Sequence, residues 1–239
     1  MTDLIFDRNQ IEERGRGLTF DDVLIVPNRS EVRSRTEPDL CAQVTRERTL
    51  KLPFLSANMD TITEVEMAQA MAQLGGLGVL HRFLPIKQQV EEILKLKAGD
   101  SPIVAASIGV NGDNRERAKA LVDAGVNLLT VDIAHGHSEL MLEILAWVKS
   151  TFPDLQVIAG NVATPQAVED LAEAGADAIK VGIGPGSMCT TRVITGCGVA
   201  QLTAIAMCAK AAEKHGVPII ADGGLRSSGD IVKALAAGA

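Results

Sequence analysis

The stretches DAGVNLLTV (Asp123–Val131) and EAGADAIKV (Glu173–Val181) repeat one pattern, in which an Ala-Gly pair ends a helical period and an apolar run follows. Glycine after a helix readily adopts the left-handed conformation that ends the helix. A short apolar run directly after it is typical of a strand that is buried on both faces. The repeat therefore predicts two helix-to-strand steps of a parallel α/β sheet.

The same alternation continues along the chain from about residue 53. Seven short apolar runs predict strands, and stretches of helical period lie between them. The predicted strands are Pro53–Asn58, Gly76–Leu80, Ile103–Ser107, Leu128–Asp132, Gln156–Gly160, Ala178–Gly182 and Pro218–Asp222, and the helical patterns include Glu64–Leu74, Asn114–Ala124, Ser138–Ser150 and Pro165–Ala174.

The chain ends in LAAGA (Leu235–Ala239), which is the first half of the repeated pattern without the strand that would follow. Seven βα units with this ending favour a (β/α)8 or TIM barrel truncated before strand 8, because a doubly wound sheet usually stops at about five or six strands. We therefore expect one α/β barrel domain over residues 1–239, with residues 1–50 as an N-terminal extension that packs on the barrel. Such a barrel would expose two unpaired strand edges.

The composition limits the class of protein and its partners. An apolar content of 46% with 22% charged residues is typical of a globular domain with a sizeable core. A net charge of −7 argues against a nucleic-acid partner. No apolar run reaches the roughly 18 residues that span a bilayer, and the N-terminus lacks a signal-peptide pattern, so we expect no membrane partner and a cytoplasmic location. The four cysteines lack CxxC spacing, which fits a reducing compartment.

The segment GIGPGSMCTTR (Gly182–Arg192) follows a predicted strand and combines a glycine-rich loop with a thiol and hydroxyls. Catalytic groups of barrel enzymes lie on loops at the carboxyl ends of the strands. Cys189 is therefore our candidate nucleophile, and Thr191 could relay a proton to or from it. The alternative is a small buried thiol, which is our interpretation of Cys208 in its helical pattern.

Two further strand ends carry carboxylates. Asp222, Gly223 and Gly224 end the last predicted strand, where a carboxylate could bind a ribose hydroxyl and glycine N–H groups a phosphate. A helix-capping aspartate with turn glycines is the alternative. Asp132 ends another strand in VDIAHGHS (Val131–Ser138) and could contact a sugar or an amide. The histidines of that loop lack an evident third ligand, so we interpret them as exposed loop residues.

The string GIGPGSMCTTR resembles the active-site loop of the IMP dehydrogenase/GMP reductase family. The resemblance covers nearly the whole chain, with motifs in the order and approximate spacing of the family. These motifs are GLTFDDVLIVP (Gly17–Pro27), ANMDT (Ala57–Thr61), AGNV (Ala159–Val162) and IIADGG (Ile219–Gly224).

The resemblance implies a role for each matching residue. Cys189 would attack C2 of a purine nucleotide monophosphate to form a covalent intermediate, and Thr191 would assist proton transfer. A homotetramer is also implied. The remaining implied contacts are the nucleotide with Ser187, Asp222, Gly223 and Gly224, a potassium ion with the carbonyls of Gly184, Gly186 and Cys189, and the nicotinamide cofactor with Asp132 and Ala134.

Within the family, three strings resemble bacterial GMP reductases: SRTE at Ser34–Glu37, LHRF at Leu80–Phe83 and DIAHGHS at Asp132–Ser138. They imply that Ser34, Arg35 and Arg82 contact NADPH, and a guanidinium group suits its extra phosphate. The short passage from Val90 to Ile103 also leaves no room for the CBS domains that are usual in IMP dehydrogenases. We therefore expect NADPH-dependent reduction of GMP to IMP and ammonia, through a thioimidate on Cys189.

Two alternatives stay open. VAQLTAI (Val199–Ile205) resembles the dehydrogenase more than the reductase, so NAD-dependent oxidation of IMP to XMP is the first alternative. In the family, the groups that distinguish the two reactions follow strand 8: a glutamate in reductases, and a mobile flap with an Arg-Tyr pair in dehydrogenases. The second alternative is therefore a catalytically incomplete nucleotide-binding fragment.

Overall fold

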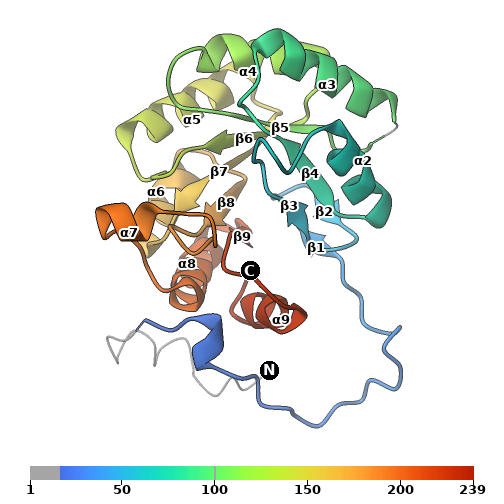
Figure 1. The fold of residues 1–239 in the computed structure, drawn as a ribbon, viewed down its shortest axis with the longest axis vertical. Helices are drawn as coiled ribbons and strands as arrows, with labels where there is room; N and C mark the ends of the chain where they lie inside the picture. The colour runs from blue at the N-terminus through green and yellow to red at the C-terminus, as the bar shows by residue number, and fades with distance from the viewer. Residues whose placement is uncertain (1–16, 100) are drawn as a thin grey trace.

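The computed structural model describes residues 17–99 and 101–239. Their main feature is a parallel sheet of seven strands in the order β3-β4-β5-β6-β7-β8-β9, which curls around a central axis with helices on its outside (Figure 1). The predicted α/β class and barrel-type course of the chain are confirmed. The strands are β3 (Leu55–Ser56), β4 (Leu77–Leu80), β5 (Ala105–Ile108), β6 (Leu128–Asp132), β7 (Gln156–Val162), β8 (Ala178–Val181) and β9 (Ile219–Ala221).

The helices follow the strands in turn, and the repeated Ala-Gly pairs lie where their chemistry predicts. Gly125 caps α4 with a φ of 110°, and Gly175 follows the end of α6 with a φ of 101°. These are left-handed conformations that glycine adopts at little cost. The helices are α2 (Val65–Leu74), α3 (Ile86–Ala98), α4 (Asn114–Ala124), α5 (Glu139–Thr151), α6 (Pro165–Glu173), α7 (Thr191–Thr195), α8 (Gln201–His215) and α9 (Ser228–Ala236).

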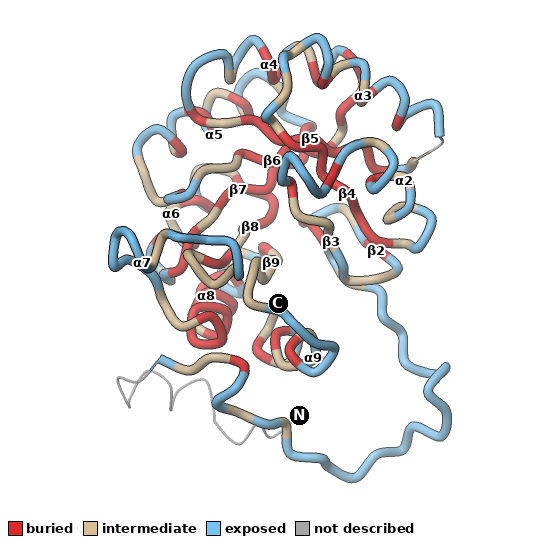
Figure 2. Tube along the Cα trace, in the orientation of Figure 1, coloured by how far each residue is buried: buried red, intermediate tan, exposed pale blue. Residues whose placement is uncertain are grey.

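The strands β4 to β8 are buried along almost their whole length, as their continuous apolar runs predict, whereas the edge strands β3 and β9 are largely half-buried (Figure 2). Alternate residues of one strand enter two different cores, because successive side chains point to opposite faces of a sheet. Leu128 belongs to a small cluster with Ile158, whereas Leu129 belongs to the large cluster between the sheet and its helices. In the described residues, β3 and β9 are the two edges of the sheet.

The N-terminal segment packs on the barrel at two places. The short 3-10 helix η1 (Phe20–Asp22) lies against α9, where Lys233 Nζ donates a hydrogen bond of 2.7 Å to the carbonyl of Phe20. Leu18 N donates to Thr203 Oγ1 of α8 over 2.7 Å. Between these contacts and the sheet, residues 26–41 are exposed and extend away from the body (Figures 1 and 2).

A β-hairpin, which the sequence analysis did not predict, precedes the sheet. It pairs β1 (Ala42–Gln43) with β2 (Thr49–Leu50), and its Val44 and Leu50 enter the small core cluster. Farther along, residues 99–104 alone separate α3 from β5. None of the helices in the described part of the chain is long and apolar enough to cross a bilayer.

Candidate active site

A cleft of about 670 Å³ lies at the carboxyl ends of the strands, and we call it the active-site cleft. Loops that follow five strands, β3, β4, β6, β8 and β9, contribute to its walls, together with Asn161 of β7. The topology therefore brings together side chains that are far apart in the sequence. Of the predicted site residues, the cleft is lined by Arg82, Asp132, Ala134, Gly184, Gly186, Ser187, Cys189, Thr191, Asp222 and Gly223.

The loop that carries Cys189 spans residues 182–199, and we call it the Cys189 loop. It leaves β8 at Gly182, where an added Cβ would lie 2.0 Å from the carbonyl oxygen of Asp222, so only glycine fits. Arg192 joins the two ends of the loop, because its Nε donates to Ile183 O over 3.2 Å and its Nη2 to Val199 O over 2.5 Å. Arg192 thus holds the two ends of the Cys189 loop together.

Cys189 is exposed, and its Sγ lies 3.2 Å from Thr191 Oγ1. Hydrogen bonds from the side chain and backbone of Thr191 lower the pKa of the Cys189 thiol, and the positive charge of Arg192 lowers it further; burial and the negative charge of Asp222 oppose the shift more weakly. The thiolate is the nucleophilic form of cysteine. The geometry therefore supports Cys189 as a nucleophile and Thr191 as its proton partner.

In two other cysteines the pKa of the thiol is raised instead of lowered. Cys208 is fully buried in α8, and burial raises the pKa of its thiol to about 12. A hydrogen bond with Asp39 raises the pKa of the Cys41 thiol. These two thiols are therefore poor nucleophiles at neutral pH, and Cys208 is the core residue that the sequence predicts.

Asp222 is held at the edge of the cleft by one hydrogen bond and one ion pair. Its Oδ2 accepts a hydrogen bond of 2.7 Å from Asn161 Nδ2 and lies 3.0 Å from Lys180 Nζ. Lys180 Nζ also donates to Asn58 Oδ1 over 2.8 Å. The carboxylate is therefore a fixed hydrogen-bond acceptor that is linked to β7 and β8 directly and, through Lys180, to the loop after β3.

The turn after Asp222 packs against the Cys189 loop. Gly223 and Gly224 have φ angles of 86° and 79°, which favour glycine. A Cβ added at Gly223 would lie 3.0 Å from the backbone nitrogen of Gly186, and one at Gly224 would lie 3.3 Å from Cβ of Pro185. This close approach places the predicted nucleotide-binding turn beside the predicted nucleophile, as expected for one bound ligand that touches both.

Known proteins match this chain over almost all of its length. A family model described as IMP dehydrogenase / GMP reductase domain matches residues 17–239. The chain belongs to this family. The inosine-5'-monophosphate dehydrogenase of Nitrosopumilus maritimus is 37% identical over 93% of this chain and 73% of its own length, and that of Cryptosporidium parvum is 45% identical over 94% of this chain and 66% of its own length. The enzyme of the same name from Bacillus subtilis is 35% identical over 93% and 71%.

Membership of the IMP dehydrogenase/GMP reductase family makes the chain part of a group of purine-nucleotide oxidoreductases. The resemblance drawn from the sequence motifs is thereby confirmed. The alignment with the N. maritimus enzyme runs over 346 residues, although this chain has 239, so that relative contains residues that have no counterpart here.

A second group of predicted residues lines the cleft at the ends of β4 and β6, and we call this part of the cleft the cofactor wall. Arg82 Nε lies 3.7 Å from Asp132 Oδ2, and its guanidinium carbon lies 4.6 Å from the ring centre of the exposed Phe83. Ala134 lines the same wall. An aromatic face, a guanidinium group and a carboxylate beside a nucleophile fit a nicotinamide cofactor, which needs a stacking surface and polar contacts.

Buried residues that the sequence analysis missed hold this wall in place. Gln89 Nε2 donates to the carbonyls of His81 and Ser107 over 2.9 and 3.0 Å. Arg117 Nη1 donates to Leu84 O over 2.8 Å and to Gln89 Oε1 over 2.7 Å. The β4–α3 loop with Arg82 is thus fixed by side chains of α3 and α4. The sequence signal that could have found them is a polar residue at an apolar-face position of a helical pattern, because such a residue is buried only when it is hydrogen-bonded.

Ser34 and Arg35 are not brought to the cleft. Both are exposed in the extended segment, where Ser34 Oγ lies 2.9 Å from Thr36 Oγ1. Neither lines the cleft of this chain. Their predicted contact with NADPH therefore stays a prediction without support from the geometry.

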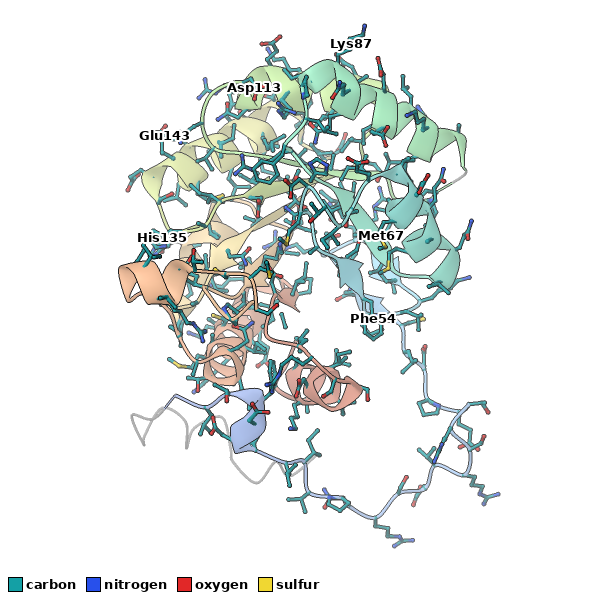
Figure 3. The ribbon with its side chains drawn as sticks, in the orientation of Figure 1. Phe54, Met67, Lys87, Asp113, His135 and Glu143 are labelled. Carbon is teal, nitrogen blue, oxygen red and sulfur yellow. The ribbon has the colours of Figure 1, made fainter. Side chains whose placement is uncertain are left out.

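Of the two loop histidines, His135 is exposed as the sequence analysis interpreted it, whereas His137 is half-buried and bonded to a neighbouring helix. His137 Nε2 lies 2.7 Å from Asp170 Oδ2, and this hydrogen bond lowers the pKa of Asp170. His135 is exposed at the edge of the molecule (Figure 3). In residues 17–99 and 101–239, no three His, Cys, Asp or Glu side chains are grouped to hold a metal ion.

Proposed function

We propose that the protein is an IMP dehydrogenase, which oxidises IMP to XMP with NAD, rather than the GMP reductase that its short motifs favour. The contact between the Cys189 loop and the Asp222–Gly224 turn carries the proposal, because the loop contains a thiol of lowered pKa and the turn is the one that we propose to bind the nucleotide. The choice of reaction is supported by relatives that are 35–45% identical and carry the name inosine-5'-monophosphate dehydrogenase.

The chemistry begins with Cys189. Its thiolate adds to C2 of IMP, and the hydride that leaves C2 converts the adduct into a covalent purine on sulfur. Water then attacks C2 and breaks the bond to Sγ, which yields XMP and the free thiol. Overall, IMP, NAD and water give XMP, NADH and a proton. Thr191 passes the proton of the thiol to solvent, and the 3.2 Å between its Oγ1 and Sγ supports this role.

The other residues of the cleft bind and orient. Asp222 accepts a hydrogen bond from a ribose hydroxyl, and the N–H groups of Gly223 and Gly224 bind the phosphate together with Ser187. Arg82, Asp132 and Ala134 hold NAD, which supplies the hydride acceptor. This division places the purine between the thiol and the cofactor wall of the same cleft.

A potassium ion would be held by the carbonyls of Gly184, Gly186 and Cys189. Gly186 O accepts the N–H of Cys189 over 3.1 Å, so two of these residues share one turn. A carbonyl oxygen has a second lone pair for such an ion, and hard oxygen ligands suit it. The ion would stabilise the conformation of the Cys189 loop.

GMP reductase is the second candidate, and Arg82 favours it. A guanidinium group in the cofactor wall suits the extra phosphate of NADPH. Steady-state assays with IMP plus NAD and with GMP plus NADPH separate the two reactions. We expect turnover with IMP and NAD that is lost in Cys189→Ala. Turnover with GMP and NADPH alone would establish the reductase, and nucleotide binding without any turnover would indicate an incomplete site.

We also propose a homotetramer in the cytoplasm. Apolar side chains are exposed near the cleft, with Met188 81%, Val193 86% and Ile194 77% accessible, and exposed apolar groups of this kind are typical of interfaces. Light scattering on the purified protein would measure the mass of the assembly. A monomeric mass would contradict this proposal.

A further inference from the structure

We propose that Lys180 is a positioning residue that makes the nucleotide site prefer ribonucleotides to deoxyribonucleotides. This inference rests on the proposed function in one respect, namely that Asp222 faces the sugar of a bound nucleotide. Lys180 was not a candidate in the sequence analysis, because it stands within the apolar pattern of the β8 strand.

Lys180 is unusual among the strand residues because its charged group is turned into the barrel. Its side chain is 12% exposed, and its Nζ lies 3.0 Å from Asp222 Oδ2 and 2.8 Å from Asn58 Oδ1. It therefore connects β8 with the loops after β9 and β3. Burying a lysine is costly unless its charge is paired and hydrogen-bonded, and both conditions are met here.

The contacts of Asp222 are all on one of its two oxygens. Oδ2 accepts a hydrogen bond from Asn161, whose Nδ2 also donates to Gly182 O over 2.8 Å and is thereby fixed, and it forms an ion pair with Lys180. Within residues 17–99 and 101–239, no protein donor bonds Oδ1. The carboxylate thus has one oxygen that protein groups engage and one that is available to a ligand in the cleft.

An ionised carboxylate accepts hydrogen bonds and cannot donate them. A ribose hydroxyl supplies the donor that Oδ1 needs, whereas a deoxyribose leaves that oxygen without a partner. Sites built around a substrate hydroxyl discriminate strongly against analogues that lack it. A hydrogen bond to a charged group corresponds to roughly 10- to 100-fold in affinity.

Lys180 affects this discrimination because it helps to fix the orientation of the Asp222 carboxylate. With Lys180 in place, the hydrogen bond from Asn161 and the ion pair with Lys180 both act on Oδ2 and keep the carboxylate from turning. Without it, Asn161 alone holds Asp222, and the carboxylate can rotate towards water. We therefore expect Lys180→Met to reduce the preference for ribose while purine and phosphate contacts persist.

Calorimetric titration of the full chain with IMP, 2′-deoxy-IMP and 3′-deoxy-IMP tests the proposal. The wild type should bind IMP roughly 10- to 100-fold more tightly than at least one deoxy analogue. In Lys180→Met this ratio should fall below about 5-fold. Should Lys180→Met fail to fold, Lys180→Gln, which keeps a polar amide at the position, provides the same comparison.

Lys149→Met is the matched control. Lys149 also forms an ion pair from a partly buried position, with Nζ 2.9 Å from Asp177 Oδ2, but it lies at the amino end of the sheet. This variant should lose stability and keep the wild-type preference for ribose. Merely structural damage would change the preference equally in both variants and would overturn the proposal.

The outcomes separate the two proposals. An unchanged ratio in Lys180→Met, or equal affinity of the wild type for IMP and both deoxy analogues, overturns the role of Lys180. Wild-type protein that binds neither IMP nor GMP refutes the proposed function itself. If GMP binds in place of IMP, the ratio of GMP to 2′-deoxy-GMP tests Lys180 although the dehydrogenase proposal has failed.

Discussion

The two ends of the curled sheet use charged residues in different ways. At the carboxyl end, Asp222 and Cys189 face a cleft and keep an oxygen and a sulfur accessible to a ligand. At the amino end, Asp177 is 5% exposed and its Oδ2 is bonded to Lys149 Nζ and to the N–H of Val157. The same strands thus support one end, the reactive end, at which polar groups remain available to a ligand and another end, the structural end, at which the protein itself satisfies their hydrogen bonds.

The largest effect is expected at the reactive end. Cys189→Ala removes the proposed nucleophile and should reduce kcat on the order of 10³-fold or more. Because Cys189 is exposed, the midpoint of urea unfolding should hardly change. Steady-state kinetics and urea titration measure the two quantities. Substantial turnover in this variant would show that the chemistry does not pass through Cys189.

A stability effect is expected at the structural end. Asp177→Ala leaves the N–H of Val157 without its acceptor and Lys149 without its counter-charge. Unfolding free energy should fall by about 2–4 kcal/mol, whereas KM of the folded enzyme should be unchanged. Asp154→Ala, at an exposed turn nearby, is the control and should leave stability within error. Equal stability of the two variants would contradict the contrast between the ends.

A smaller effect concerns the environment of Cys189. Thr191→Val removes the hydroxyl that lowers the pKa of the thiol, so that pKa should rise towards its usual value. The thiolate then forms only at higher pH, and alkylation by iodoacetamide at neutral pH should slow about fivefold. The rate of alkylation against pH, followed by mass spectrometry, measures the shift. A curve that coincides with that of the wild type would exclude this role of Thr191.

The smallest effect is expected for the core cysteine. Cys208 is fully buried, and Cys208→Ala should cost about 1 kcal/mol of stability without changing kcat. Its thiol, with a pKa raised to about 12, should resist alkylation in the folded protein and react after unfolding in urea. Modification of Cys208 as fast as that of Cys189 under native conditions would contradict the burial described above.

Local patterns along the chain were enough to predict most of the sheet and its helices. Predicted and observed bounds agree fully for α4 (Asn114–Ala124) and differ by one residue for β8. The hairpin β1–β2 was missed because strands of two residues are too short to show a period. The position of the hairpin is determined instead by the burial of Val44 and Leu50 in the small core cluster.

The candidate site was predicted where a motif contains its own chemistry. Cys189, Thr191 and Asp222 are recognisable because thiol, hydroxyl and carboxylate follow strand ends next to glycines. Ser34 and Arg35 were included through a short resemblance, which contains no information about their distance from the cleft. Local strings predict residue types at a site more reliably than they predict which segments meet there.

The sequence by itself determined the α/β class, the succession of strands and helices, the family and the candidate nucleophile. These features depend on periodicity, on glycine conformations and on contiguous motifs, all of which are local along the chain. Only the tertiary structure decided that Lys180 and Asn161 hold one oxygen of Asp222, and that Gln89 and Arg117 fix the wall with Arg82. Such contacts join residues on different elements, so they form only when the sheet curls and brings the strand ends together.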